Sequence, residues 1–224
     1  MAVVGRGRWF AVVSAGVVAL AGCSGGAERP AIVALTSLPR LAEYPAGYSL
    51  LEQPGSISAE DPGTAMPLTF VDDRCRPVIE NPVGAGARES VASGTNPAVF
   101  LVQIVESDLA IAELTDLVRR CADVEATSGN STLRMTVAPA NVPKTVAAES
   151  IAIRTTGTQE KRVGDAEPTR TPIAQQRFLA RVGNYVLSAL VMLSPMPEQG
   201  LAAELDVLAR VFQIAVDRLT AETR

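Results

Sequence analysis

The 224-residue sequence contains no histidine. Histidine is the side chain whose ordinary pKa places its charge change near neutral pH, and it is the commonest metal ligand in proteins. Its absence excludes hydrolases in which histidine activates a serine or cysteine nucleophile. We therefore expect no catalytic centre of that kind, no metal site and no cofactor, and the composition favours a protein that is not an enzyme.

Aromatic residues are also scarce, at 4% of the chain, with one Trp, three Tyr and five Phe. Carbohydrate sites commonly use exposed aromatic faces, so a sugar-binding role is disfavoured. The apolar residues are instead mostly aliphatic. A pocket in this protein would be lined by Val, Leu, Ile, Ala and Met, which suits lipid or another apolar ligand. The alternative, that these side chains only fill the core, stays open.

The first 22 residues have the pattern of a bacterial export signal. Arg6 and Arg8 precede an apolar run that begins at Trp9. From Trp9 to Gly22 there are 14 residues, whereas a helix that crosses a bilayer needs about 20. Because Arg6 and Arg8 are not adjacent, they do not form a twin-arginine pair, and the general export route is indicated.

The run ends in residues 20–23, LAGC, which resemble the lipobox of bacterial lipoproteins. In that family the cysteine thiol is alkylated with diacylglycerol, and the chain is cut just before it. The resemblance implies that residues 1–22 are a lipoprotein signal peptide and that Cys23 is the lipid anchor. It further implies a protein held on the extracytoplasmic face of the cell membrane.

The chain that this cleavage would leave is acidic. Residues 1–22 hold two of the 20 basic residues and none of the 24 acidic ones, so their removal changes the net charge from −4 to −6. Phosphate binding needs a basic face, and we therefore expect no nucleic-acid partner. The remaining 202 residues suffice for one ordinary domain, which we place at 31–224 behind a short polar tether at 23–30.

Two further cysteines, Cys75 and Cys121, remain in the exported chain. An even number of cysteines in an oxidising compartment indicates a disulfide. A bridge closing a loop of about 46 residues would stabilise the fold by about 4 kcal/mol in the chain-entropy description. The alternatives are two buried thiols, or a metal site of which two thiolates supply at most half the ligands.

The first half of the expected domain is poor in regular patterns. Residues 52–98 contain many Pro, Gly, Asn and Asp, which predicts mostly turns and loops. Residues 99–105 are apolar on both faces, which is typical of a central strand. Apolar residues then recur at helical spacing and predict a helix over 108–124, with Ser107 as its N-terminal cap.

The second half alternates more clearly. Strands are predicted at 132–137 and 150–155, each with one apolar face, followed by a mobile polar connection at 157–172. Gly183-Asn184 lies between two strand patterns and predicts a type II′ hairpin. That turn fixes the facing pairs: Val182 with Tyr185, Ala180 with Leu187, and Phe178 with Ala189.

The last segment of the chain has an apolar stripe from Leu201 to Leu219, with spacings of three and four residues. This pattern predicts a long helix that packs across a sheet. A helix lying on a membrane surface is the alternative. Its polar side would then be basic, whereas here Glu204 and Asp206 alternate with Arg210.

Carboxylates in the loop-rich half are the remaining catalytic candidates. A pair of carboxyl groups across a cleft can hydrolyse glycosidic bonds without histidine. Scattered acids on loops are more often simply solvated, so a carboxylate-based hydrolase is the less favoured hypothesis. The residues concerned are Asp61, Asp72, Asp73, Glu80 and Glu89.

Several features together resemble mycobacterial envelope lipoproteins similar to the extracellular sensor domain of the kinase PknH and to the lipoprotein LpqN. These are the lipobox, the turn at residues 44–48, the cysteine on a helix after the first long strand, and a hairpin followed by a long final helix. The resemblance implies an α/β (α+β) fold in which helices flank a twisted antiparallel sheet, with a cleft for a ligand or partner. The kinase sensor domain has two disulfides, whereas this chain can form one.

The expected function is therefore a non-enzymatic, membrane-tethered, sensor-like module. Its partner would be an apolar small molecule or an envelope protein. A structural or assembly factor that holds an envelope protein is the alternative, and no ligand-binding residue can be assigned from the sequence.

Overall fold

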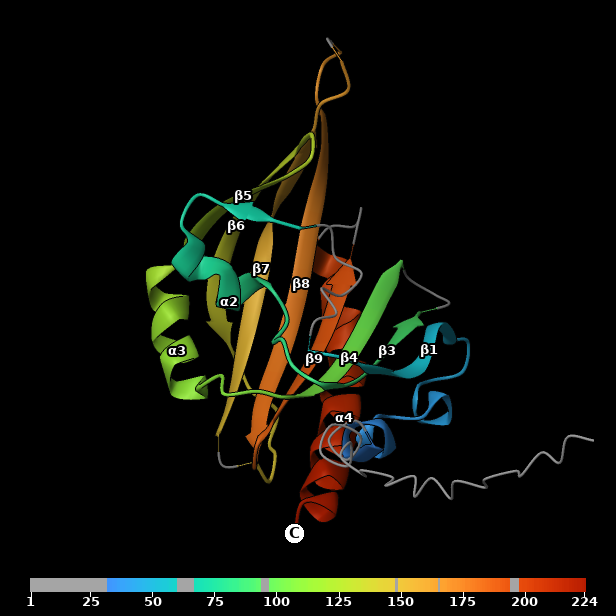
Figure 1. The fold of residues 1–224 in the computed structure, drawn as a ribbon. Helices are drawn as coiled ribbons and strands as arrows, with labels where there is room; N and C mark the ends of the chain where they lie inside the picture. Colours follow the sequence, from blue (N-terminus) through green and yellow to red (C-terminus); the bar gives the residue numbers. More distant parts are fainter. Residues whose placement is uncertain (1–31, 60–66, 94–96, 148, 165, 194–197) are drawn as a thin grey trace, which may run out of the picture.

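A nine-stranded antiparallel sheet, in the order β1-β3-β4-β9-β8-β7-β6-β5-β2, forms the centre of the molecule (Figure 1). The computed structural model describes residues 32–59, 67–93, 97–147, 149–164, 166–193 and 198–224. The expected signal peptide, the anchor Cys23 and the tether lie outside the described residues. The strands are β1 (Ser49–Ile57), β2 (Thr69–Phe70), β3 (Gly86–Ala92), β4 (Ala98–Glu106), β5 (Asp123–Ser128), β6 (Ser131–Ala140), β7 (Glu149–Lys161), β8 (Thr169–Val182) and β9 (Tyr185–Leu193).

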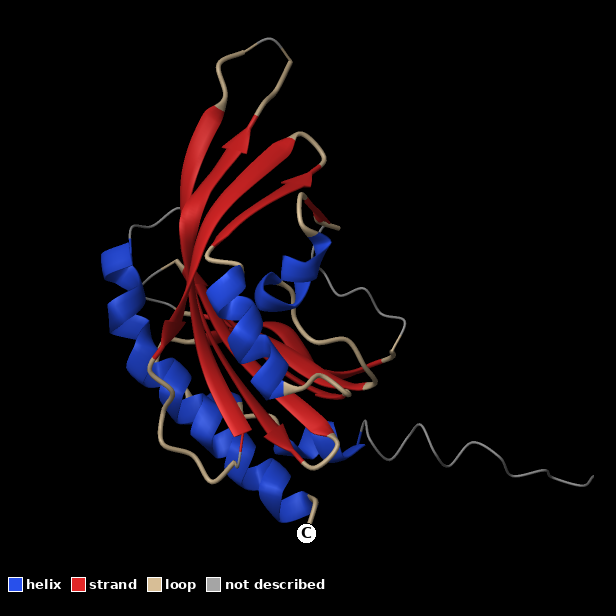
Figure 2. Cartoon of the chain, turned by 90° about the vertical axis from the view of Figure 1, so that its left-hand side faces the viewer, coloured by secondary structure: helices blue, strands red, loops and turns tan. Residues whose placement is uncertain are grey.

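Helices cover both faces of this sheet (Figure 2). They comprise an N-terminal helix at 32–37, the 3-10 turns η1 (Leu41–Glu43) and η2 (Asp73–Cys75), and the α-helices α2 (Arg76–Ile79), α3 (Ile111–Arg120) and α4 (Glu198–Glu222). The expected α/β (α+β) fold, with a twisted antiparallel sheet and a long C-terminal helix on it, is confirmed.

The long helix α4 packs against β4, β8 and β9 on one face of the sheet. Its stripe is buried as the spacing predicts, with Leu208, Phe212 and Leu219 fully inaccessible to solvent. Phe178 on β8 meets Phe212 at a ring-centroid distance of 5.4 Å. Helix α4 is therefore a core helix. Within the described residues, no helix is both long and apolar enough to cross a membrane.

A second core lies on the opposite face, under α2 and α3. The apolar side of α3, formed by Ile111, Leu114 and Val118, is buried. It packs with side chains of β5–β8 that alternate toward it, among them Met135 and Ile153. Each face of the sheet thus has its own core, and the side chains of β4 that take part, such as Phe100, Val102 and Ile104, belong to the core under α4.

The hairpin between β8 and β9 is confirmed in register. Val182 faces Tyr185, Ala180 faces Leu187, and Phe178 faces Ala189. Gly183 has a φ of 58°, and Asn184 is not among the residues with positive φ. A positive φ at the first turn residue alone is what a type II′ turn requires, and glycine adopts it without strain.

The prediction that residues 52–98 are mostly loops is wrong, because β1 and β3 both lie there. The sequence of β3, GARESVA, has few large apolar residues, but the strand lies between β1 and β4 and is mostly buried. A Cβ on Gly86 would come within 1.9 Å of the Ile104 carbonyl oxygen. The small residues therefore allow close strand contact, while the outer strand β1 tolerates Pro54 at the sheet edge.

Two other boundaries differ from those predicted. Helix α3 begins at Ile111 after Ala110, and the Ser107 hydroxyl instead accepts a hydrogen bond from the Leu109 N–H at 3.3 Å. The helix ends at Arg120 because the residues from Asp123 onward pair with β6 as strand β5. Cross-strand pairing therefore determines where this helix ends.

The polar segment 157–172 does not form a mobile connection. Strands β7 and β8 stay paired along most of it, up to Lys161 opposite Thr169. Both ribbon views show this hairpin projecting past the helices (Figures 1 and 2). Because neither layer of helices reaches it, polar side chains are tolerated on both of its faces.

Candidate binding cavity

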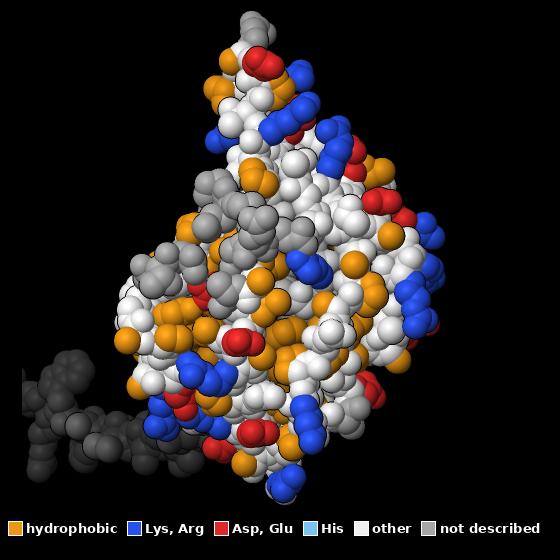
Figure 3. All heavy atoms as spheres, turned by 180° about the vertical axis from the view of Figure 1, so that it is seen from behind, with side chains coloured by type: hydrophobic (Ala, Val, Ile, Leu, Met, Phe, Trp, Pro, Cys, Tyr) orange, Lys and Arg blue, Asp and Glu red, His pale blue; other side chains and the backbone are white. Residues whose placement is uncertain are grey.

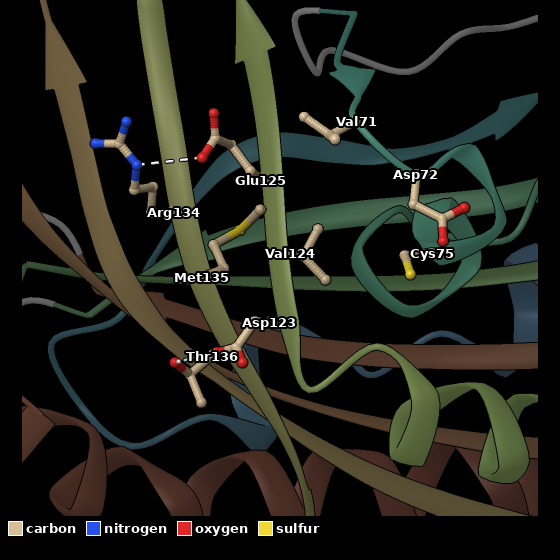
Figure 4. Close-up of a pocket in the computed structure, with 9 residues that line it drawn as sticks. All are labelled: Val71, Asp72, Cys75, Asp123, Val124, Glu125, Arg134, Met135 and Thr136. Carbon is tan, nitrogen blue, oxygen red and sulfur yellow. Dashed lines mark hydrogen bonds and ion pairs between the residues drawn. The ribbon is translucent and has the colours of Figure 1, made fainter.

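An open cavity of about 380 Å³ lies at the edge of the sheet where β2 pairs with only two residues of β5. Its walls come from the chain after β2, from β5 and from β6 (Figure 4). Ligand cavities in proteins are commonly about 300–1,000 Å³, so this volume suits a small molecule or one group of a larger ligand. The lining residues are Val71, Asp72, Cys75, Asp123, Val124, Glu125, Arg134, Met135 and Thr136.

The inner part of the cavity is apolar. Val124, Met135 and the disulfide-bonded Cys75 are buried parts of the core under α3. Val71, in contrast, is 78% exposed. It therefore offers an apolar surface to a ligand without being needed to fill the core.

Paired charged side chains line the rest of the cavity. Because side chains alternate along a strand, Glu125 and Arg134 lie on the opposite face of the sheet from Val124 and Met135 and reach the cavity at the sheet edge. Arg134 contacts Glu125 at 3.2 Å across the two strands, and also reaches Glu160 at 3.6 Å. Asp72 accepts hydrogen bonds from the backbone and side chain of Arg74, which hold the pKa of that carboxyl below its ordinary value. A carboxylate whose pKa is lowered in this way is a poor general acid, so Asp72 is better suited to binding than to acid–base chemistry.

The predicted disulfide between Cys75 and Cys121 is confirmed, with a Cα–Cα distance of 5.7 Å. It ties η2 to the end of α3 and so fixes one wall of the cavity. Neither cysteine is left to bind a metal, and no cluster of three or more metal-ligating side chains occurs among the described residues.

Arg177 on β8 supports the same wall from inside the sheet. Its guanidinium is buried and donates hydrogen bonds to the backbone carbonyls of Val78 and Glu80, and longer ones to those of Pro77 and Ile79 at 3.3 and 3.5 Å. These are the carbonyls that a short helix leaves without partners inside the helix. Burial lowers the pKa of Arg177 to about 10, so it remains a cation at neutral pH.

Neighbouring strands hold the segment that follows α2. The Gln103 side-chain amide on β4 donates to the carbonyl of Pro82 at 2.6 Å, and the Ser188 hydroxyl on β9 donates to Asn81 at 3.1 Å. Polar residues in the middle of apolar strands therefore position residues 77–82. The sequence offers little signal for this role, because Arg177 directly follows the polar Gln175 and Gln176.

The carboxylates proposed from the sequence do not converge on one site. Asp61 lies outside the described residues, and Asp72 alone lines the cavity. Asp73 and Glu80 are bound to Arg76 at 2.7 and 2.9 Å. Glu89 shares one face of β3 with Ala87 and Val91, which belong to the core under α4, and so lies on the opposite face of the sheet from α2.

Glu89 is the most perturbed of these acids. Its side chain is inaccessible to solvent and accepts a hydrogen bond of 3.0 Å from the Tyr44 hydroxyl, while its second oxygen has no hydrogen-bond partner among the described residues. Burial raises its pKa to about 7. Nearby, the Tyr48 hydroxyl donates a hydrogen bond to the buried Glu204. The ring of Tyr44 packs against that of Phe100, with 6.0 Å between the ring centroids. This cluster ties the N-terminal segment to the sheet.

The sheet face that α4 covers over β4, β8 and β9 continues onto β5–β7, where its side chains are charged. Arg134 lies between Glu125 and Glu160, and Arg170 reaches Glu160 at 3.3 Å. The side chain of Arg134 is 60% exposed. Seen from behind, basic and acidic side chains are intermixed along this side of the molecule (Figure 3).

The fold is similar to two solved mycobacterial structures. The extracellular domain of PknH from Mycobacterium tuberculosis superposes with a TM-score of 0.51 at 15% identity, covering 83% of this chain and 93% of that domain. An uncharacterized protein of Mycobacterium smegmatis, the Rv0999 ortholog, superposes with a TM-score of 0.51 at 13% identity, covering 85% of this chain and 98% of that chain. No family model and no curated protein matches the sequence. The expected resemblance to the PknH sensor domain is thus confirmed at the level of the fold.

Proposed function

We propose that this protein is a non-enzymatic binding module, tethered through Cys23 to the extracytoplasmic face of the cell membrane, that receives an apolar group of a ligand in the cavity beside β5. The observation that carries the proposal is the exposed Val71 beside the apolar side chains of Val124 and Met135, at a sheet edge that also carries the Arg134–Glu125 ion pair. Such a site binds an apolar group and uses its polar rim to orient the rest of the ligand. The similarity to an extracellular sensor domain and the lipobox support the location.

The binding test changes the cavity without changing the core. Val71→Glu places a charge at the apolar part of the cavity on a side chain that is already 78% exposed. Val163→Glu is the matched control, because Val163 is 64% exposed in the loop between β7 and β8 and does not line the cavity.

Two measurements apply to these variants. Native mass spectrometry of protein purified from its own membranes detects a ligand that remains bound, and titration with anilinonaphthalene sulfonate probes the cavity with an aromatic ring. We expect Val71→Glu to lose the bound ligand and to weaken dye binding about tenfold, the equivalent of 1.4 kcal/mol, while Val163→Glu behaves as the parent protein. Equal ligand retention and equal dye affinity in the two variants would show that the cavity is not the binding site.

A second candidate function is an assembly factor that holds an envelope protein. The observation in its favour is the exposed, charge-alternating face of β5–β7, since charges of both signs fix the register of a protein partner. Crosslinking in cells followed by purification discriminates between the two functions. One stoichiometric protein partner, lost on reversing Arg170 to Glu, would favour the assembly factor, because Arg170 does not line the cavity.

A further inference from the structure

The first described segment, residues 32–51, has an apolar side that no core covers. Ala34 and Leu38 point into the core under α4 and are 0% and 3% exposed. On the other side of the helix at 32–37, Ile32 and Leu35 are 59% and 38% exposed. Farther along the segment, Leu41 in η1 is 38% exposed and Leu51 in β1 is 59% exposed. Among the described residues these four are the only leucines and isoleucines with so much accessible surface. We name them the N-terminal apolar patch.

The surface that the patch would meet follows from the position of the proposed anchor. Eight residues lie between Cys23 and Ile32, so nine Cα-to-Cα steps join them, and nine steps reach at most about 32 Å even when extended. A lipid on Cys23 therefore keeps the patch within about one bilayer thickness of the membrane surface. At such a distance, even a small apolar surface encounters the membrane at high effective concentration.

The surrounding charges are compatible with a lipid surface. The exposed Arg40 directly precedes Leu41, and the carboxylate of Glu43 is bound to Arg218 at 2.5 Å. A cation beside apolar side chains favours a membrane interface that contains anionic headgroups. Arg218 also donates to the Leu38 carbonyl at 2.8 Å, so α4 holds this segment in place.

We propose that the N-terminal apolar patch is seated on the lipid bilayer and sets the orientation of the domain. The proposal rests on the membrane tethering proposed above and adds a second, non-covalent contact. Figures 1 and 2 show the N-terminal helix and the C-terminal end of α4 at one end of the molecule and the β7–β8 hairpin at the other. The bound orientation directs that hairpin away from the membrane and leaves the cavity beside β5 accessible.

The composition of the chain offers a direct test. Trp9 is the only tryptophan, so the chain from Cys23 onward, which contains every described residue, has none. Leu41→Trp and Leu51→Trp place a single fluorophore in the patch, and Val163→Trp places it in the loop between β7 and β8. Leu41 and Leu51 are preferred to Ile32 because they lie farther along the chain from the tether.

Each variant is attached through the Cys23 thiol to a maleimide lipid in phosphatidylcholine–phosphatidylglycerol vesicles that contain brominated phosphatidylcholine. Cys75 and Cys121 do not react, because they form the disulfide. We expect the fluorescence emission of Leu41→Trp and of Leu51→Trp to shift to shorter wavelength and to fall about twofold on quenching. Val163→Trp should show neither change.

Quenching absent from both patch variants, or equal in all three, would overturn the proposal. A dimer that forms without vesicles and disappears in Leu41→Glu would overturn it as well, because a second copy would then occupy the patch. Unfolding midpoints equal to that of the parent protein show that each variant is folded. The chemical attachment makes the result independent of whether cells modify Cys23, so failure of this inference and failure of the tethering proposal are distinguishable.

Discussion

The Tyr44 hydroxyl donates a hydrogen bond of 3.0 Å to Glu89, and both side chains are buried in the core under α4. The pKa of Glu89 is raised from 4.5 to about 7: burial raises it most, the hydrogen bond from Tyr44 lowers it, and nearby Glu43 and Arg218 raise and lower it by less. Burial also raises the pKa of Tyr44, which stays protonated as the donor. This contact joins the N-terminal segment to β3 through a carboxyl group that titrates near neutral pH.

Glu89 should make the protein less stable as the pH rises. Between pH 4.5 and 7 the folded state keeps a proton that the unfolded state has released, so the free energy of unfolding falls through this range and levels off above it. The loss amounts to about 3 kcal/mol at most. Urea unfolding at pH 4 and pH 8 measures this difference in the free energy of unfolding. In Glu89→Gln, which cannot ionise at this position, most of the difference between the two pH values should disappear. Glu113→Gln, on the exposed side of α3, should keep it; identical profiles for all three proteins would contradict the role of Glu89.

Arg177→Met should destabilise the protein by about 3 kcal/mol, because it removes the donors for the buried carbonyls of residues 77–80. The expected consequence is local as well as global, with faster proteolysis between β2 and β3. Arg170→Met is the matched control on the same strand, since Arg170 is 74% exposed and pairs only with Glu160 in the contacts described above. Surface pairs of this kind contribute about 0–1 kcal/mol, so equal effects of the two variants would refute the assigned role.

Replacing both Cys75 and Cys121 by Ser should lower the free energy of unfolding by about 4 kcal/mol, the closure entropy of a loop spanning 46 residues. Thermal unfolding of parent and variant, each with and without reductant, checks the value. Reductant should destabilise the parent and leave the double variant unchanged. If reductant also destabilises the double variant, then the reductant acts at a place other than the Cys75–Cys121 disulfide.

Cys23→Ala should abolish attachment of lipid. Cells fed an alkyne fatty acid report this directly, because the label enters the protein only through the modified residue. Cys75→Ser is the control and should keep the label, since Cys75 is bonded to Cys121. Full labelling of Cys23→Ala would exclude the lipobox assignment.

The elements that the sequence predicted well are those governed by neighbours along the chain. The hairpin at Gly183 and the stripe from Leu201 to Leu219 depend on turn conformation and on helical periodicity, both of which are local properties. Their registers and faces agree with the structure. In contrast, β3 and the outer part of β7–β8 owe their conformation to strands paired beside them, which a pattern of apolar residues does not reveal.

Most residues that line the candidate cavity could not be predicted from the sequence. Of its lining residues, Asp72 was proposed as a possible acid and Cys75 as half of a disulfide, whereas Val71, Val124 and Met135 had no assigned role. Val124 was even expected in a helix. The alternating burial of β5, in DVEATS, was the signal that could have corrected this, but the strand is too short to distinguish it from the end of α3.

The resemblance of the N-terminal residues to an export signal and a lipobox, the lack of histidine, the paired cysteines and the periodic elements can all be identified from the sequence alone, because each depends on residue type or on spacing along the chain. Which polar residues are buried depends instead on how the strands and helices pack together. Arg177 reaches the α2 carbonyls and Glu89 meets Tyr44 only because strands distant in sequence are brought together. The cavity and the N-terminal apolar patch are likewise properties of assembled surfaces, where the packing of one side chain leaves another exposed.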